Sequence, residues 1–342
     1  MAKKKAATKD PLDAAVEEIN GKYGDGSIMS MDDFGGDIET YSTGSMRLDE
    51  ALGGGIARGR IIELFGWESS GKTTTCLSVI AQAQKLGHRA FFIDAEHALD
   101  PVWAERVGVS MSPDLFRIAQ PGCGEEALQI ADRLAEAGAA LVVIDSVAAL
   151  TPKAELDGEI GDAHVGRQAR MMSQAMRKLA AVCKNNQCTM LFVNQLRHKV
   201  GGMPGFGGPQ KTTPGGHALK FYASQRIDIA RKGSLTEGGK VEDGGKSIGQ
   251  RCIAKVTKNK VAPPFRVAEY DIMFDSGISF ESELIDIAVA KKVMTKSGAW
   301  FKYGDTNVGQ GKEKTRQRLI EDEALRNEIH LAIQQEKTDD TE

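Results

Sequence analysis

One eight-residue segment constrains the fold of this chain more than any other part of it. Residues 66–73 read Gly-Trp-Glu-Ser-Ser-Gly-Lys-Thr and match the pattern G-x-x-x-x-G-K-[ST] at every defining position. We expect a buried strand at 61–65, directly before the segment, and a helix at 74–85 after it. A strand, a loop and a helix in this order predict a binding loop for a nucleoside triphosphate. A chance match that binds no nucleotide is the alternative.

Each position of this loop has an expected role. Gly66 and Gly71 let backbone N–H groups approach the phosphates, and the dipole of the following helix favours an anion at its N-terminus. We expect Lys72 to reach the β- and γ-phosphates and the Thr73 hydroxyl to hold Mg²⁺. The other loop positions expected to contact the nucleotide are Trp67, Glu68, Ser69, Ser70 and Thr74.

Composition limits the other functions that this chain can have. A formal net charge of −3 gives no global sign of nucleic-acid binding, so such binding has to depend on local basic patches. Five cysteines without a C-x-x-C pair or a secretory signal indicate reduced thiols that pack in the core. No apolar run reaches membrane-spanning length, and we expect a cytoplasmic protein with no membrane partner.

The chain divides into four expected parts, because 342 residues exceed one usual domain. Residues 1–35 form an N-terminal arm whose helix at 11–23 has an apolar stripe, and residues 36–279 form the core. Residues 280–335 form a small α/β domain with a charged helix near 313–335, and residues 336–342 form a short acidic tail.

The core is predicted to be an α/β fold with a mostly parallel sheet. Near-continuous apolar strands alternate with helical segments, which is typical of a parallel sheet covered by helices on both faces. The expected strands are 61–65, 90–94, 141–145 and 189–193.

Polar residues follow these strands, where ligands of parallel sheets bind. Glu96 could polarise a water molecule against the γ-phosphate, and Asp145 is expected to position Mg²⁺. Gln195 could hydrogen-bond the terminal phosphate or the attacking water. Acids at strand ends also cap helices, and for Asp94 that alternative is equally good.

A second unusual segment, 197–217, follows Gln195 directly. It contains no acidic residue, and its glycines and prolines exclude a regular element. A phosphate-sensing strand end joined to a cationic loop suggests a switch, although a passive insertion is the alternative. Met203 and Phe206 could wedge between bases.

The helix expected at 164–184 has an apolar face and a separate basic face. Arg170 and Arg177 lie on the basic face, together with Lys178. A solvated charged surface is the simplest interpretation of these residues alone. Beside the basic loop, they instead suggest a track for a nucleic-acid backbone.

Seven ordered blocks of the chain carry a resemblance to a known family. They read Ser-Thr-Gly-Ser at 42–45 with Leu-Gly-Gly-Gly at 52–55, Glu-Ser-Ser-Gly-Lys-Thr-Thr at 68–74, Ile-Asp-Ala-Glu-His-Ala-Leu-Asp-Pro at 93–101, Asp-Ser-Val-Ala-Ala-Leu-Thr-Pro at 145–152, Gly-Glu-Ile-Gly-Asp at 158–162, Met-Met-Ser-Gln at 171–174 and Lys-Phe-Tyr-Ala-Ser at 220–224. Over essentially its whole length, the sequence resembles the RecA family of bacterial DNA recombinases.

The resemblance implies an activity and roles for single residues. Proteins of this family polymerise on single-stranded DNA as ATP-bound helical filaments, pair it with homologous duplex and exchange strands. Lys72 and Thr73 take the phosphate and Mg²⁺ roles, Glu96 activates water, Asp145 takes the Mg²⁺-associated role and Gln195 senses the γ-phosphate. Asp100 and Trp103 fall where the family contacts adenine, with Trp103 in place of the common tyrosine and Trp67 in place of a usual proline.

The resemblance also implies DNA contacts and a subunit interface. The two DNA-binding loops fall at about 158–165 and 196–213, and Arg170 and Arg177 align with the family's basic helix. Lys258 and Lys260 match lysines that reach the nucleotide of the adjacent subunit, and the N-terminal helix docks head-to-tail on the next subunit. The remaining residues expected to bind DNA are Arg197, Lys199, Met203, Phe206, Lys211, Gly215 and Gly216.

Partners follow from the same resemblance. Single- and double-stranded DNA, further copies of the chain, a LexA-type repressor whose self-cleavage the filament promotes, and loading and regulatory proteins are expected. Two other classes stay open at this point: a ring-forming P-loop motor such as a hexameric helicase, and a regulatory scaffold whose nucleotide only controls assembly.

Overall fold

The computed structural model describes residues 10–24, 26–30, 38–159, 162, 166–198, 211–237 and 245–339, with side chains as far as residue 335. The chain forms two compact units, Met1–Glu39 and Thr40–Glu342. The first contains helix α1 (Pro11–Tyr23), which confirms the helix expected at 11–23. Asp10 caps this helix by accepting a hydrogen bond from the Leu12 amide at 2.9 Å. Its apolar side chains Leu12 and Tyr23 are exposed within this unit.

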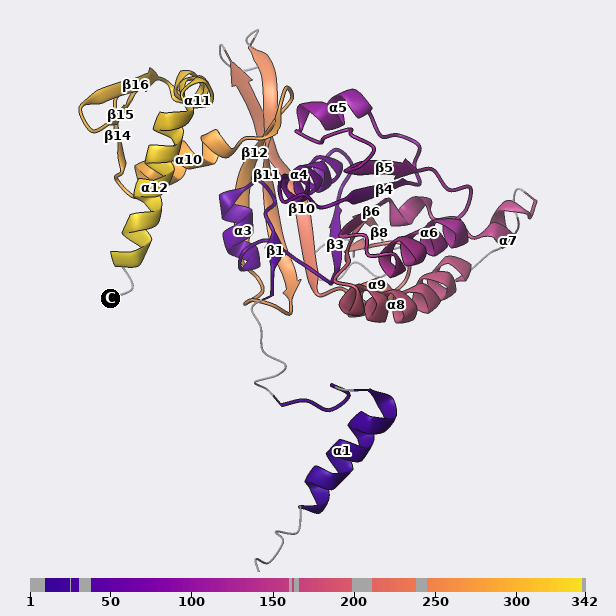
Figure 1. Ribbon diagram of the computed structural model, residues 1–342. Coiled ribbons are helices and arrows are strands. Elements are labelled where there is room, and N and C mark those ends of the chain that lie inside the picture. Colours follow the sequence, from indigo (N-terminus) through magenta and orange to yellow (C-terminus); the bar gives the residue numbers. More distant parts are fainter. Residues whose placement is uncertain are drawn as a thin grey trace, which may run out of the picture. The chain divides into compact units, whose positions relative to one another are not determined.

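The second unit is built on a nine-stranded sheet with the order β13-β12-β11-β10-β3-β7-β6-β4-β5 (Figure 1). From β10 to β5 all neighbouring strands are parallel, whereas β11, β12 and β13 join antiparallel. The parallel strands are β3 (Ile61–Gly66), β4 (Ala90–Asp94), β5 (Phe116–Ala119), β6 (Leu141–Asp145), β7 (Thr189–Gln195) and β10 (Gln225–Glu237). The predicted α/β class and the four predicted strands are therefore confirmed.

Helices cover both faces of the parallel part (Figure 1). Because successive side chains of a strand point to opposite faces, Leu64 packs with α4 on one face and Ile144 packs with α6 and α8 on the other. This explains why the strands read as continuous apolar runs. The helices are α3 (Met46–Leu52), α4 (Lys72–Lys85), α5 (Pro101–Arg106), α6 (Gly124–Glu136), α7 (Lys153–Leu156), α8 (Arg167–Asn185) and α9 (Ala218–Tyr222), with the 3-10 turn η1 (Val147–Ala149).

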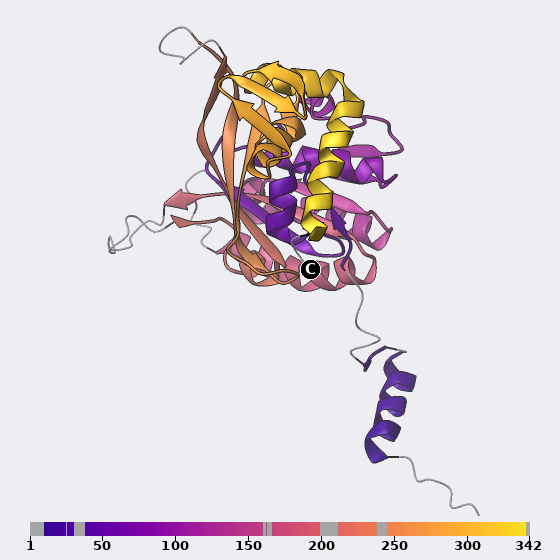
Figure 2. The ribbon, with the colours of Figure 1, turned by 90° about the vertical axis from the view of Figure 1, so that its left-hand side faces the viewer.

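The antiparallel part of the sheet is a long hairpin with two further strands. β10 pairs along most of its length with β11 (Lys246–Asn259), and the far end of the hairpin projects beyond the helical layers (Figure 2). β12 (Val267–Met273) and β13 (Gly277–Ile278) complete this side. Two short ladders lie outside the main sheet: β1 (Thr40–Tyr41) with β2 (Ile56–Ala57), and β8 (Arg197–His198) with β9 (Lys211–Thr212).

A smaller helical and antiparallel layer follows β13. It contains α10 (Phe280–Ala290), β14 (Met294–Ser297), β15 (Trp300–Tyr303), β16 (Thr306–Gln310), α11 (Lys312–Glu321) and α12 (Glu323–Asp339). The single helix expected near 313–335 is wrong, because Asp322 leaves the helical conformation. Its side chain accepts a hydrogen bond from the Leu325 amide at 3.1 Å and so caps a second helix.

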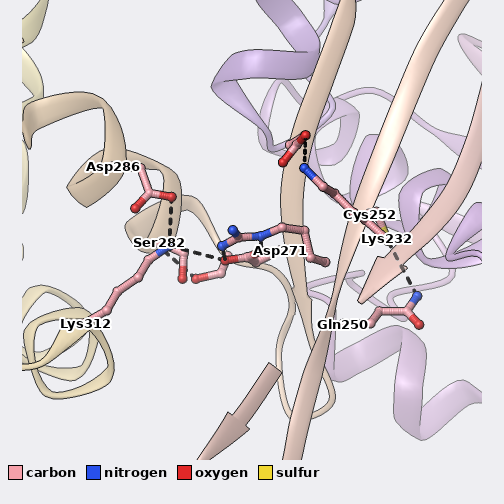
Figure 3. Close-up of polar contacts among 10 residues, drawn as sticks. Lys232, Gln250, Cys252, Asp271, Ser282, Asp286 and Lys312 are labelled. Atoms are coloured by element: carbon pink, nitrogen blue, oxygen red, sulfur yellow. Dashed lines mark hydrogen bonds and ion pairs between the residues drawn. The ribbon is translucent and has the colours of Figure 1, made fainter. Parts of the chain in front are cut away.

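Ion pairs join this layer to the sheet (Figure 3). Arg251 of β11 donates two hydrogen bonds to Asp271 of β12, at 2.7 and 3.0 Å. Lys312 of α11 contacts Asp271 at 3.4 Å and Asp286 of α10 at 2.8 Å. The chain of four charges therefore runs from the sheet into two helices of the C-terminal layer.

Two whole-chain features considered in the sequence were the cysteines and the apolar character of the helices. Four of the five cysteines are buried and all five are free thiols, as expected of packing residues. Among the described residues, no helix combines the length and the apolar character needed to cross a bilayer.

Candidate functional site

The phosphate loop connects the end of β3 to the start of α4. Gly71 precedes Lys72 with a φ of 94°, a conformation that favours glycine, and a Cβ there would lie 2.5 Å from the Ile272 side chain. A Cβ on Gly66 would lie 2.0 Å from the carbonyl oxygen of Ile229. Both glycines are therefore required by space, and Gly71 by its backbone conformation as well.

The Lys72 ammonium lies inside the curve of this loop. Its Nζ donates to the carbonyl oxygen of Trp67 at 2.7 Å and to Ser70 Oγ at 3.5 Å. Burial lowers the pKa of Lys72, while the nearby carboxylates of Asp145 and Glu96 oppose that shift. The loop thus holds a desolvated cation at a helix N-terminus, an arrangement suited to a phosphate chain.

A carboxylate and a hydroxyl meet beside the loop. Thr73 Oγ1 donates to Asp145 Oδ2 at 2.6 Å. Burial raises the pKa of Asp145 to about 6, with Glu96 adding to the rise and the Thr73 hydrogen bond opposing it. Hydroxyl and carboxylate oxygens are the ligands that Mg²⁺ prefers, and a divalent cation would offset the cost of burying this carboxylate, so the pair fits Mg²⁺.

Two side chains from the ends of β6 and β7 converge on Glu96, which follows β4. Ser146 Oγ donates to Glu96 Oε1 at 2.5 Å, and Gln195 Nε2 donates to the same oxygen at 2.9 Å. The pairing of β7 with β3 places Gln195 opposite Gly66, at the start of the phosphate loop. Sequence reasoning missed Ser146, although its position directly after Asp145 is a signal that could have found it.

The alternative that Asp94 caps the next helix is wrong, because its side chain stabilises a turn instead. Its carboxylate accepts hydrogen bonds from the amides of Ala98 and Leu99, both at 3.2 Å, and from Gln120 Nε2 at 3.1 Å. These bonds hold the turn that carries Glu96 after β4. The next helix, α5, is capped instead by Asp100.

Of the two residues expected near adenine, Trp103 lies beside the phosphate loop. Trp103 Nε1 donates to Thr74 Oγ1 at 3.3 Å, and a cavity of about 300 Å³ lies between Trp103 and the loop. Asp100 is engaged with the amide of Val102 at 2.9 Å. Three residues that line the cavity were missed because β11 and β12 bring them from distant sequence: Gln250, Ile272 and Phe274.

Residues of β11 and β12 also form hydrogen bonds with the phosphate loop and with α4. The Cys252 thiol donates to the Ser70 carbonyl at 3.4 Å. It accepts from Gln250 Nε2 at 3.5 Å (Figure 3). Tyr270 and Thr75 share a hydrogen bond of 3.0 Å between their hydroxyls. Burial raises the pKa of Cys252 to about 12, so this residue stays a neutral thiol donor.

The expected DNA-binding loops are described at their bases. β8 and β9 pair Arg197 with Thr212 and His198 with Lys211, so the two ends of the second loop lie together. Arg197 and Lys211 are exposed. Lys199, Met203 and Phe206 lie outside the described residues, as does part of the first loop.

Gly215 and Gly216 turn the chain back onto α8. Their φ values are 82° and 74°, and a Cβ on either would lie 2.8 Å from Val147 or Ala169 respectively. The structure thus gives these two glycines a steric role at the end of the loop.

The basic helix α8 is oriented as its pattern predicts. Its buried side chains are Met172, Met176, Leu179 and Cys183. Arg170 and Arg177 are exposed, whereas Lys178 forms an ion pair with Asp132 of α6. Lys178 is therefore not a free member of the basic face.

Lys258 and Lys260 do not lie beside the phosphate loop of their own chain. Lys258 pairs with Arg226 in the sheet, and Arg226 pairs with Glu63, so these lysines lie toward the beginning of β3. The loop begins at the other end of that strand. Lys258 Nζ instead donates to the carbonyl oxygens of Lys220 at 2.9 Å and Phe221 at 2.7 Å.

Comparisons with known proteins agree with this geometry. The model of the RecA N-terminal domain matches residues 10–279, and that of the RecA C-terminal domain matches residues 282–338. The chain is 54% identical to Protein RecA of Rhodopirellula baltica over 95% of this chain and 85% of the relative. It is 53% identical to Protein RecA of Allochromatium vinosum over 95% of this chain and 92% of the relative. The chain therefore belongs to the RecA family of DNA-dependent ATPases that act in DNA recombination and repair.

Proposed function

We propose that this chain polymerises on single-stranded DNA as an ATP-bound helical filament, pairs the strand with homologous duplex and catalyses strand exchange. The observation that carries this proposal is the position of Lys258 and Lys260, whose place in the sheet is remote from the phosphate loop of the same chain. From this position, Lys258 and Lys260 would contact a nucleotide bound to another copy of the chain. ATP hydrolysis would then require assembly of the subunits.

Within one ATP site, each side chain has a separate task. Lys72 holds the β- and γ-phosphates, Gln195 donates to the terminal phosphate, and Glu96 orients the attacking water. Thr73 and Asp145 would hold Mg²⁺, which when bound neutralises charge on the phosphate oxygens. Support for the adenine side comes from the cavity between the loop and Trp103. Asp100 belongs to this part of the proposal by resemblance.

Lys258 and Lys260 would complete the site of the next subunit. A cation supplied in trans stabilises charge during phosphoryl transfer and is typically worth about 10³–10⁵ in rate. Phe221, whose carbonyl accepts from Lys258, is 72% exposed, which is unusual for a large apolar side chain and fits a covered interface. The interface is heterologous and open, and so it builds a helix of subunits.

The proposed division of the chain follows these tasks. Residues 1–35 are the assembly arm, 36–279 the ATPase core, 280–335 a small C-terminal domain and 336–342 a short acidic tail. The exposed Leu12 and Tyr23 of α1 support docking of the arm onto another copy.

DNA is proposed to lie along α8 and the two loops. Arg170 and Arg177 are exposed cations on that helix, and Arg197 and Lys211 are exposed at the base of the second loop. These residues would hold the phosphate backbone, since contacts of this kind bind without reading sequence. Met203 and Phe206 would contact bases.

The filament is also proposed to promote self-cleavage of a LexA-type repressor in the SOS response. This role, recruitment by loading and regulatory proteins, and a cytoplasmic location all follow from the family. The repressor role is tested separately, by adding purified LexA-type repressor to the protein with ATP and single-stranded DNA. Uncleaved repressor would remove this part of the proposal and leave the recombinase assignment intact.

The decisive experiment is ATPase activity with and without single-stranded DNA, followed by homologous strand exchange. We expect strong stimulation by DNA and a sigmoidal dependence on protein concentration. ATPase that is unchanged by DNA would refute the proposal. Electron microscopy of the ATP-bound protein separates a filament from the closed ring expected of a hexameric helicase.

A further inference from the structure

The side chain of Trp67 reaches from the phosphate loop to the base of the second DNA loop. Its ring centre lies 4.9 Å from that of His198, with an angle of 42° between the planes. On the other strand of the same base, Lys211 Nζ lies 5.6 Å from the centre of the Trp67 ring. His198 and Lys211 are register partners in β8 and β9, so one indole contacts both ends of the loop.

The backbone of Trp67 is tied to the phosphate-binding residue. Its carbonyl oxygen accepts the 2.7 Å hydrogen bond from Lys72 Nζ. The same residue therefore contacts the ammonium that holds phosphate through its backbone, and the DNA loop through its ring. A phosphate group that draws Lys72 Nζ away from this carbonyl oxygen would therefore change the hydrogen bonding of the Trp67 peptide.

A second connection runs beside the first. Gln195, only two residues before Arg197, donates to Glu96 at 2.9 Å and approaches the loop from the strand side. Gln195 is joined to the loop through the strand that enters it. The contacts of Trp67 differ because they also include the strand that leaves it.

We propose that Trp67 is a positioning residue that couples the occupancy of the ATP site to the base of the second DNA loop. This inference rests on the proposed function, since it assigns a route for the coupling between ATP and DNA. An aromatic pair and a cation over an aromatic face are both favourable, and both depend on the relative orientation of the groups. Movement of the Trp67 peptide therefore changes the preferred position of β8 and β9.

The test measures how much ATP tightens DNA binding. The dissociation constant for fluorescent single-stranded DNA is compared with ADP and with a slowly hydrolysed ATP analogue, and the ratio of the two is the coupling. In His198→Leu, which replaces the ring by an aliphatic side chain, we expect the coupling to fall by about fivefold. In His198→Phe, which keeps a ring, the coupling is expected to be retained.

His330 provides a matched control. Its ring contacts Phe280 at 5.3 Å in the C-terminal layer, so His330→Leu removes a similar aromatic contact that does not involve Trp67. We expect His330→Leu to leave the coupling unchanged. The thermal unfolding midpoints of His198→Leu and His330→Leu are measured as well. A folding defect in either variant would appear as a lower midpoint than that of the parent chain.

A double-mutant cycle tests whether the two rings act through one another. Trp67→Leu is expected to reduce the coupling, and adding His198→Leu to it is expected to cause no further loss. The tryptophan emission that is lost in Trp67→Phe reports the indole itself. Addition of DNA should change that part of the emission in the parent chain and not in His198→Leu.

Several outcomes would overturn the inference, and they differ from failure of the proposed function. If the parent chain shows coupling and His198→Leu retains it, or if the effects of Trp67→Leu and His198→Leu are additive, Trp67 does not act through His198. If DNA affinity falls equally with both nucleotides, His198 is only a DNA contact. If the parent chain itself binds DNA equally with ADP and with the ATP analogue, both the proposed function and this inference fail.

Discussion

Exchange of active-site parts between subunits gives the sharpest test of the proposed ATP site. Register places Lys258 opposite Arg226 and Arg226 opposite Glu63, three residues before Gly66. At about 3.3 Å per residue and about 4.8 Å per strand, the Lys258 backbone lies about 10 Å along the sheet and about 10 Å across it from the loop, or about 14 Å in all. Its Nζ is also held by two carbonyl groups. With this strand register, Lys258 cannot contact the nucleotide bound to its own chain.

The perturbation is a mixture of two inactive proteins. Lys72→Ala removes the phosphate-binding ammonium, and Lys258→Ala removes the cation proposed to act on the neighbour, at a cost of about 10³ or more in rate. In an equimolar filament of random order, about one interface in four joins an intact phosphate loop to an intact Lys258, because a head-to-tail interface has one direction. DNA-stimulated ATPase should then recover to about a quarter of the wild-type value.

The control and the refuting result follow from the same arithmetic. A chain with both substitutions, mixed with Lys258→Ala, creates no complete interface and should give no recovery. Lys260→Ala is assayed in the same way. ATPase that stays at the level of the single variants at every mixing ratio would refute action in trans, provided that the mixture still forms filaments by electron microscopy.

Three further predictions concern single side chains. Glu96→Gln should keep DNA binding while ATP turnover falls by about 10²–10⁴, and equal loss of both would remove the role assigned to Glu96. Burial raises the pKa of Glu283 from its ordinary value of 4.5 to about 7. Ionisation of this carboxyl group therefore lowers the free energy of unfolding as the pH rises from 4.5 through 7. Glu283→Gln should therefore gain up to about 3 kcal/mol in urea unfolding above pH 7 and almost nothing near pH 4.5, and a gain that does not depend on pH would contradict this. Arg251→Ala should cost about 1–3 kcal/mol in the same assay because it leaves Asp271, 4% exposed, with Lys312 alone. The control Lys232→Ala, in a more exposed ion pair between β10 and β12, should cost under about 1 kcal/mol.

The core strands were predictable because local pattern and long-range structure agree in them. Buried parallel strands are apolar on both faces, so Leu64 and Ile144 belong to continuous apolar runs that can be read without knowing their neighbours. The phosphate loop was predictable for a related reason. Its requirement for glycine at position 71 is a property of the backbone there.

The break between α11 and α12 shows where pattern reading failed. Residues 313–335 have a continuous helical composition, and nothing in it distinguishes Asp322 from a solvated acid. Packing decided the break, because Leu319 and Ile329 are both buried in the same apolar cluster while Asp322 turns the chain and caps the second helix.

The sequence by itself determined the α/β class, the phosphate loop and the polar residues that end each strand, because those signals lie within a few residues of one another. Only the tertiary structure decided that Ser146 and Gln195 share one oxygen of Glu96, that Cys252 supports the loop from behind, and that Trp67 contacts both ends of the second DNA loop. These contacts join residues 50 to 182 positions apart, or both ends of one loop. Their partners are selected by strand order and register, which depend on the packing of the whole sheet and leave no mark on any short stretch of sequence.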